Sequence, residues 1–188
     1  MARLVYNFEN PDRFIAGTVG QPGSRAFYLQ ARNGERIVSV LLEKVQVNLL
    51  AERLIALLEE VRERGANVPK EAAATDVDTG PLDEPINETF RVGTMAIVWD
   101  GEDESIVVEA RALSEDEEAA DELEEPDAAV EADDDSDVVR VHLSPRKALA
   151  FAKRALDLVA SGRPPCPFCG QPLNPEGHIC TRRNGFMH

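Results

Sequence analysis

AFYLQARNGERIVSVLL, residues 26–42, is the stretch that decides the fold. Two runs of strand-forming residues, 26–31 and 36–42, flank the dipeptide Asn33-Gly34. An Asn-Gly pair between alternating residues is the strongest short signal for a β-hairpin, because both residues tolerate the backbone angles of a tight turn. The stretch therefore predicts two antiparallel strands joined by a short connection.

Towards the N-terminus, residues 4–8 and 13–19 are also rich in strand formers, and Gln21-Pro22-Gly23-Ser24 has the composition of a turn. Together with residues 26–42 they predict an antiparallel meander of four strands.

Three glycines in this region, Gly17, Gly20 and Gly23, are spaced three apart. A phosphate-binding loop needs a helix N-terminus behind its glycines, whereas a strand follows here, so the spacing favours a hairpin turn.

Beyond the hairpin the hydrophobic period changes from two to about 3.6, which predicts an amphipathic helix from about Lys44 to Arg64, ended by Gly65. Residues 90–99 and 105–113 predict a second hairpin around Asp100-Gly101. Residues 138–143 predict a further strand. Ser144-Pro145 is then an N-cap followed by proline in the first helical turn, so a second helix should run to about Ala160.

Between these parts lies a stretch of a different composition. Residues 114–137 contain 14 acidic side chains and no lysine or arginine. Such a segment cannot bury enough apolar surface to offset its chain entropy, so a disordered acidic loop is expected.

The predicted class is α+β: an antiparallel sheet of about six to seven strands with two helices packed on it, plus a C-terminal zinc knuckle. Residues 1–162 should form one domain interrupted by the loop at 114–137, and residues 163–188 the knuckle.

The net charge of −15 is concentrated in the middle of the chain, and both ends are mildly basic. This distribution argues against a protein that coats nucleic acid with its whole surface. No run of apolar residues is long enough to span a membrane, and the first residues do not resemble a signal peptide. We therefore expect a cytoplasmic protein.

The C-terminal region carries the pattern with the clearest chemistry. Cys166, Cys169, His178 and Cys180 follow the spacing C-x2-C-x8-H-x-C, and they include all three cysteines of the chain. A C-x2-C turn brings two sulfurs to one edge of a tetrahedron, and soft thiolate ligands suit zinc. The pattern predicts one zinc ion, with Glu176 or His188 as alternatives to His178. A complete set of four ligands favours a structural site over a catalytic one, and three free cysteines in a tail are the alternative.

Other candidate sites are weaker. His142 lies in a strand pattern and is expected to be an ordinary strand residue. The chain contains none of the common nucleophile, phosphate-loop or metalloprotease motifs, and cysteines bound to zinc are poor nucleophiles.

The favoured function is a non-enzymatic, zinc-stabilised protein-interaction or regulatory module with a protein partner. One alternative is a nucleic-acid-associated factor that uses the basic side chains around the knuckle, Arg163, Arg182 and Arg183, with Phe168 and Phe186. The other is an enzyme with a pocket between sheet and helix.

Several stretches together resemble a known family: Phe8–Phe14, Gly20–Gly23, Leu41–Val47, Arg163–Cys169, Gly177–Cys180 and Arg183–Gly185. They are similar to an uncharacterised actinobacterial family, catalogued as domain of unknown function number 3090. The resemblance covers nearly the whole chain apart from the acidic stretch, and it supplies no catalytic residues. Members tend to accompany a phosphoinositide-kinase-like protein and a histidine-phosphatase-like protein, so the resemblance implies a shared pathway or complex.

Overall fold

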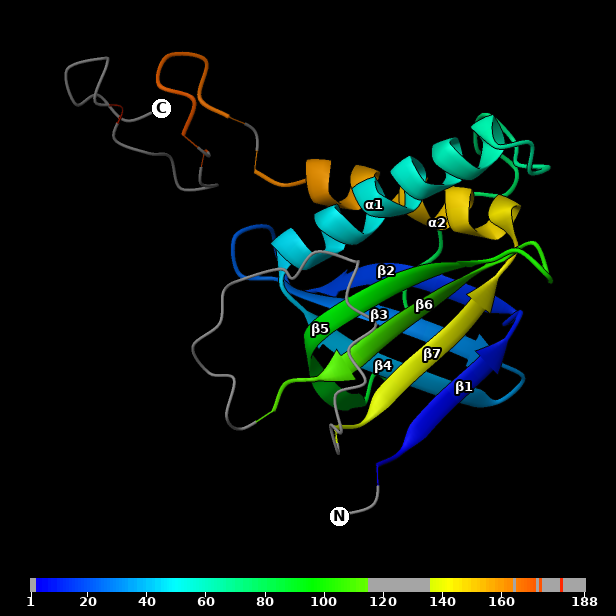
Figure 1. Cartoon of the computed structure of the whole chain (residues 1–188). Helices are drawn as coiled ribbons and strands as arrows, with labels where there is room; N and C mark the ends of the chain where they lie inside the picture. The colour runs from blue at the N-terminus through cyan, green and yellow to red at the C-terminus, as the bar shows by residue number, and fades with distance from the viewer. Residues whose placement is uncertain (1–2, 115–135, 164, 172, 174–179, 181–188) are drawn as a thin grey trace.

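The fold is built on one seven-stranded sheet with the order β1-β7-β6-β5-β4-β3-β2. The computed structural model describes residues 3–114, 136–163, 165–171, 173 and 180. The strands are β1 (Val5–Glu9), β2 (Arg13–Val19), β3 (Ala26–Asn33), β4 (Arg36–Leu42), β5 (Glu88–Asp100), β6 (Ser105–Ala112) and β7 (Val138–Leu143). The helices α1 (Lys44–Glu63) and α2 (Pro145–Ala160) cover the same face of the sheet (Figure 1). The predicted α+β class is confirmed.

The first strand does not join the predicted meander. β2, β3 and β4 pair antiparallel in chain order, and Asn33 pairs with Arg36 across a two-residue hairpin loop, as expected. β1 instead pairs in parallel with β7 at the opposite edge of the sheet. Residues 10–12 join the two edge strands, and so short a link reaches only about 14 Å. The sheet must therefore curl until its edges approach, and Arg36 accordingly lies 4.8 Å from the ring centre of Phe8 on β1.

The sheet is mixed rather than purely antiparallel, which corrects the sequence-based prediction at two strand pairs. The second parallel pair is β4 with β5. Ser39 lies opposite Glu88 and Leu41 opposite Arg91, so the first residues of β5 run beside the last residues of β4. α1 carries the chain away from the end of β4 for about 30 Å, and the connection after it brings the chain back, so that the two strands run in the same direction.

The connection between α1 and β5 covers the sheet face that the helices leave open. Ala16 belongs to the core under the helices, so its neighbour Gly17 points to the other face. A methyl group on Gly17 would lie 2.5 Å from Leu82 Cγ, so the connection packs directly against β2. Gln30 on β3 donates to the Asp83 carbonyl at 3.0 Å and accepts from the Asp83 N–H at 2.8 Å.

β7 joins the two sides of the acidic stretch in one sheet. It pairs antiparallel with β6 and parallel with β1, which confirms that residues 138–143 belong to the N-terminal sheet. α2 starts as predicted: the Ser144 hydroxyl accepts from the Lys147 N–H at 3.3 Å, and Pro145 occupies the first turn. The acidic residues 115–135, where a disordered loop was predicted, lie outside the described residues.

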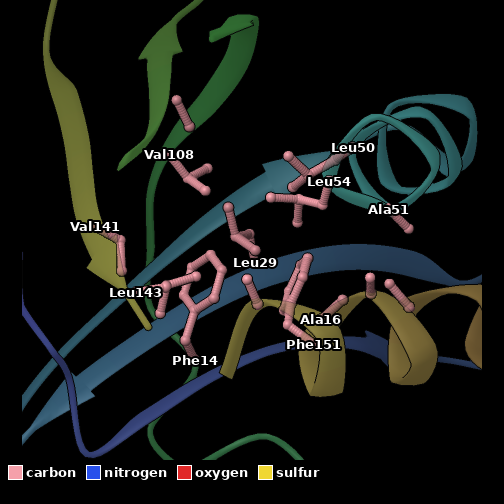
Figure 2. Packing of buried hydrophobic residues seen from close by; sticks show 14 of the residues in the cluster. Phe14, Ala16, Leu29, Leu50, Ala51, Leu54, Val108, Val141, Leu143 and Phe151 are labelled. Atoms are coloured by element: carbon pink, nitrogen blue, oxygen red, sulfur yellow. The ribbon is translucent and has the colours of Figure 1, made fainter. Parts of the chain in front are cut away.

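The main core lies between the sheet and the two helices (Figure 2). Phe14 of β2 stacks on Phe151 of α2, with ring centres 4.5 Å apart and planes inclined by 28°. Leu54 of α1 is fully buried above β3 and β4. Truncating a leucine in such a position costs about 2–5 kcal/mol, so the helices are firmly fixed on the sheet. No helix in the described part of the chain is both long and apolar enough to cross a bilayer.

One end of the sheet, here called the knuckle end, gathers the features that concern function. β4 and β6 end there, β5 and β7 begin there, and α1 starts there directly after β4. α2 runs back from the end of β7 and finishes at this end, so the chain enters residues 163–188 from here (Figure 1).

Candidate metal centre

Cys166 and Cys169 are held by a tight backbone turn. The Gly170 N–H donates to the Cys166 carbonyl at 2.8 Å, and the Cys166 N–H donates to the Gln171 carbonyl at 2.7 Å. Gly170 has a φ of 74°, a conformation that residues with a Cβ rarely adopt. Gly170, directly after the second cysteine, therefore allows the chain to close the turn around the two sulfurs.

Cys180 completes a group of three sulfurs. The Sγ atoms of Cys166, Cys169 and Cys180 all lie within 4.8 Å of one another. The Sγ atoms of Cys166 and Cys180 are 3.9 Å apart, and all three cysteines are free thiols. Cys166 and Cys180 are buried and Cys169 is half-buried. This arrangement of three soft ligand atoms could hold a metal ion.

The electrostatics of the group favour a cation at its centre. Burial raises the pKa of Cys166, but N–H groups of Cys169 and Phe168 that point at its sulfur, with the neighbouring thiols, bring the pKa below its usual value. The Gln171 N–H lowers the pKa of Cys169, yet burial and the two neighbouring thiols outweigh it, so that pKa is raised. Ionising one sulfur thus makes it harder to ionise the next. A divalent cation removes this repulsion and deprotonates coordinating thiols.

The remaining predicted ligand and its alternatives, His178, Glu176 and His188, lie outside the described residues, as do Arg182, Arg183 and Phe186. Phe168, between the first two cysteines, is 46% exposed. Arg163 lies on the β2–β3 turn, since a methyl group on Gly23 would be 3.2 Å from its Nε. Gly20 and Gly23, both at positive φ, shape this turn.

His142 behaves as a strand residue. It is half-buried on β7 opposite Glu9 of β1, with 3.6 Å between its Nε2 and the Glu9 Oε1. His142 does not line the cavity beside α2 that is described below.

The structure also contains an ionic cluster that sequence reasoning missed. Arg13 of β2 donates to both carboxylate oxygens of Asp78, at 2.5 and 2.8 Å. Arg154 of α2 donates to the carbonyls of Ala16, at 2.7 Å, and Gly80, at 2.8 Å. Arg13, Asp78 and Arg154, here called the ionic clasp, therefore tie the α1–β5 connection to β2 and α2. Its members lie 65 and 76 positions apart in sequence, so no local pattern could indicate it.

The clasp borders a cavity of about 130 Å³ between β2 and α2, which also touches Lys147 and Phe151. The hydrogen bonds from Arg13 lower the pKa of Asp78 to about 2. Lys147 donates to the Pro11 carbonyl at 2.7 Å. The basic groups of this cavity are thus used by the chain itself, and its volume is below the 300–1,000 Å³ that is usual for ligand pockets.

The comparison with known families agrees with the resemblance drawn from the sequence. The family model described as "Protein of unknown function (DUF3090)" matches residues 6–180, on both sides of the acidic stretch and as far as Cys180. No curated protein and no solved structure matches the chain. The match covers far more than half of the sequence, and the chain therefore belongs to the DUF3090 family of proteins of unknown function.

Proposed function

We propose that this chain is a non-enzymatic protein-interaction or regulatory module whose C-terminal knuckle folds around one zinc ion. Cys166, Cys169 and Cys180 would hold the ion, and His178 would supply the fourth ligand. The observation that carries the proposal is the convergence of three sulfurs from two separate stretches of the chain. When bound, the ion supplies folding free energy to a segment that is too short to form a core of its own.

Zinc is the metal that best suits these ligands. With Zn–S bonds of about 2.3 Å, two sulfurs on a tetrahedral ion lie about 3.8 Å apart. The separation of 3.9 Å between Cys166 and Cys180 is close to this value. Harder cations such as Mg²⁺ and Ca²⁺ take oxygen ligands instead, so a group of three thiols disfavours them.

A structural role is favoured over a catalytic one by the surroundings of the sulfurs. Two of the three cysteines are buried, and the cavity beside the ionic clasp has no cysteine in its wall. The alternative of an enzyme pocket between sheet and helix would fall on the cavity beside the ionic clasp. The small volume of that cavity, and the use of its basic groups in holding the chain together, support a structural role there as well.

The test is elemental analysis of protein purified without added metal, combined with co-purification of partners from its native cells. We expect about one zinc per chain and a partner protein that is retained by the unmodified chain and lost with Cys169→Ser. A zinc content near zero would contradict the proposed zinc site. Retention of nucleic acid, sensitive to salt and to the loss of basic knuckle residues, would instead support the nucleic-acid alternative.

A further inference from the structure

A basic pocket lies at the knuckle end, next to the point where the chain enters residues 163–188. Its volume is about 310 Å³. Three basic residues and one carboxylate line it: Arg25, Lys44, Arg91 and Glu43. The apolar part of the wall comes from the half-buried Leu41 and from Phe27 and Leu42, which are buried. The ionisable groups in its wall have a net charge of +2, whereas the whole chain carries −15.

Arg25 is fixed in place by the end of α2. Its Nη2 donates to the Leu158 carbonyl at 3.0 Å, and its guanidinium lies 4.9 Å from the ring centre of Phe27. A positive charge near the last carbonyls of a helix is favourable, so this arginine has a structural reason to be there. Its charge nevertheless contributes to the pocket wall.

Lys44 has no such structural explanation. It is exposed and occupies the first turn of α1, where a positive charge opposes the helix dipole. The first turn of α1 contains no acidic residue. A methyl group on Gly162 would lie 3.4 Å from Lys44 Nζ and 3.8 Å from Arg25 Nη2. Both cations therefore lie beside the residue that directly precedes the knuckle. Arg91, which also lines the pocket, pairs with Glu43.

We propose that this basic pocket docks an acidic segment of a protein partner, a proposal that rests on the interaction function proposed above. A carboxylate of the partner pairs with Lys44, and an apolar neighbour packs against the half-buried Leu41. Charge complementarity selects this occupant: the pocket is basic, compact and partly apolar. A nucleic acid fits less well, because it needs many successive phosphate contacts, whereas this pocket presents three basic residues.

The pocket is tested with a charge reversal that the fold should tolerate. Lys44→Glu places a negative charge in the first turn of α1, where the helix dipole favours it. Lys70→Glu is the matched control, because Lys70 is equally exposed and follows the far end of α1, so net charge changes identically. The probe is a fluorescent peptide of about twelve residues in which glutamate and leucine alternate, with a second peptide that carries glutamine instead. The full chain is used, so that the peptide binds in competition with the chain's own acidic residues.

We expect the glutamate peptide to bind more tightly than the glutamine peptide, and its binding to weaken as salt is added. Lys44→Glu should weaken it about fivefold or more, from one lost attraction and one added repulsion, and Lys70→Glu less than about twofold. Absence of peptide binding, equal effects of both variants, or tighter binding of a single-stranded oligonucleotide overturns the proposal. Zinc content is measured on the same samples. Loss of peptide discrimination with normal zinc content refutes the pocket alone, whereas missing zinc refutes the knuckle alone.

Discussion

Cys166 Sγ lies 3.9 Å from Cys180 Sγ, although the two residues are 14 positions apart in the chain. A disulfide would bring the sulfurs to about 2.05 Å, and two ligands of one tetrahedral zinc ion lie about 3.8 Å apart. The distance therefore fits shared coordination.

Loss of one sulfur ligand should unfold the knuckle and leave the sheet intact. Cys180→Ser is expected to lower bound zinc from about one ion per chain to near zero, because three ligands of a structural site bind far more weakly than four. Backbone amide signals should change from Pro165 onward and remain in place for β1–β7. NMR spectra with elemental analysis of the same sample check this. A chain that keeps its zinc, or loses its sheet signals, would contradict the prediction.

The fourth ligand is tested by replacing His178. His178→Ala should release zinc to a weak chelator at least about tenfold faster than the unmodified chain, because one coordinate bond is lost. His142→Ala is the matched control, since His142 lies on β7 and not near the sulfurs. If both variants hold zinc as the unmodified chain does, the fourth position belongs to Glu176, His188 or water. Water there would reopen the question of zinc chemistry.

The sequence predicts those parts of the fold whose signals are local. The hairpin of residues 26–42, the helical period after Lys44 and the cap at Ser144 all became the expected elements. Long-range pairing was not predictable in the same way. Nothing in residues 4–8 indicates a partner at residues 138–142, because that pairing depends on how the finished sheet curls. The parallel β4–β5 pair likewise depends on the path of the connection after α1.

The same division holds for the candidate sites. The spacing of Cys166 and Cys169 predicts their turn, and the spacing C-x2-C-x8-H-x-C predicts that Cys180 approaches them, as its sulfur does. The basic pocket combines Arg25, Lys44 and Arg91 from three different elements. Each of them looks like an ordinary surface charge in the sequence, and only the packing of α1 beside the β2–β3 turn brings them together.

Shortening the acidic stretch should change the stability of the body very little. The Ala112 N–H donates to the Asp137 carbonyl at 2.8 Å, so a short turn can join the two ends. Replacing residues 115–135 with four glycine and serine residues should change the free energy of unfolding by no more than about 1 kcal/mol, since loop closure depends only logarithmically on length. A variant of equal length with serine at each acidic position separates charge from length. Urea denaturation measures both. A loss of several kcal/mol would mean that the stretch contributes contacts to the body.

The ionic clasp should make stability depend on pH in a defined window. Hydrogen bonds from Arg13 lower the pKa of Asp78 from 3.8 to about 2 in the folded protein. A lowered folded pKa means that the contribution is complete above about pH 4 and is lost as pH falls through about 2. After discounting for solvent screening, we expect about 1 kcal/mol from this pair. Asp78→Asn should lower the free energy of unfolding by about this amount at pH 7, and its deficit should vanish towards pH 2.

Asp76→Asn is the control, because Asp76 lies in the same connection and its partner Arg146 is largely exposed, so its effect should be smaller. Urea denaturation at a series of pH values measures these differences. A deficit for Asp78→Asn that stays constant from pH 7 to pH 2 would show that the charge of Asp78 does not hold the connection in place.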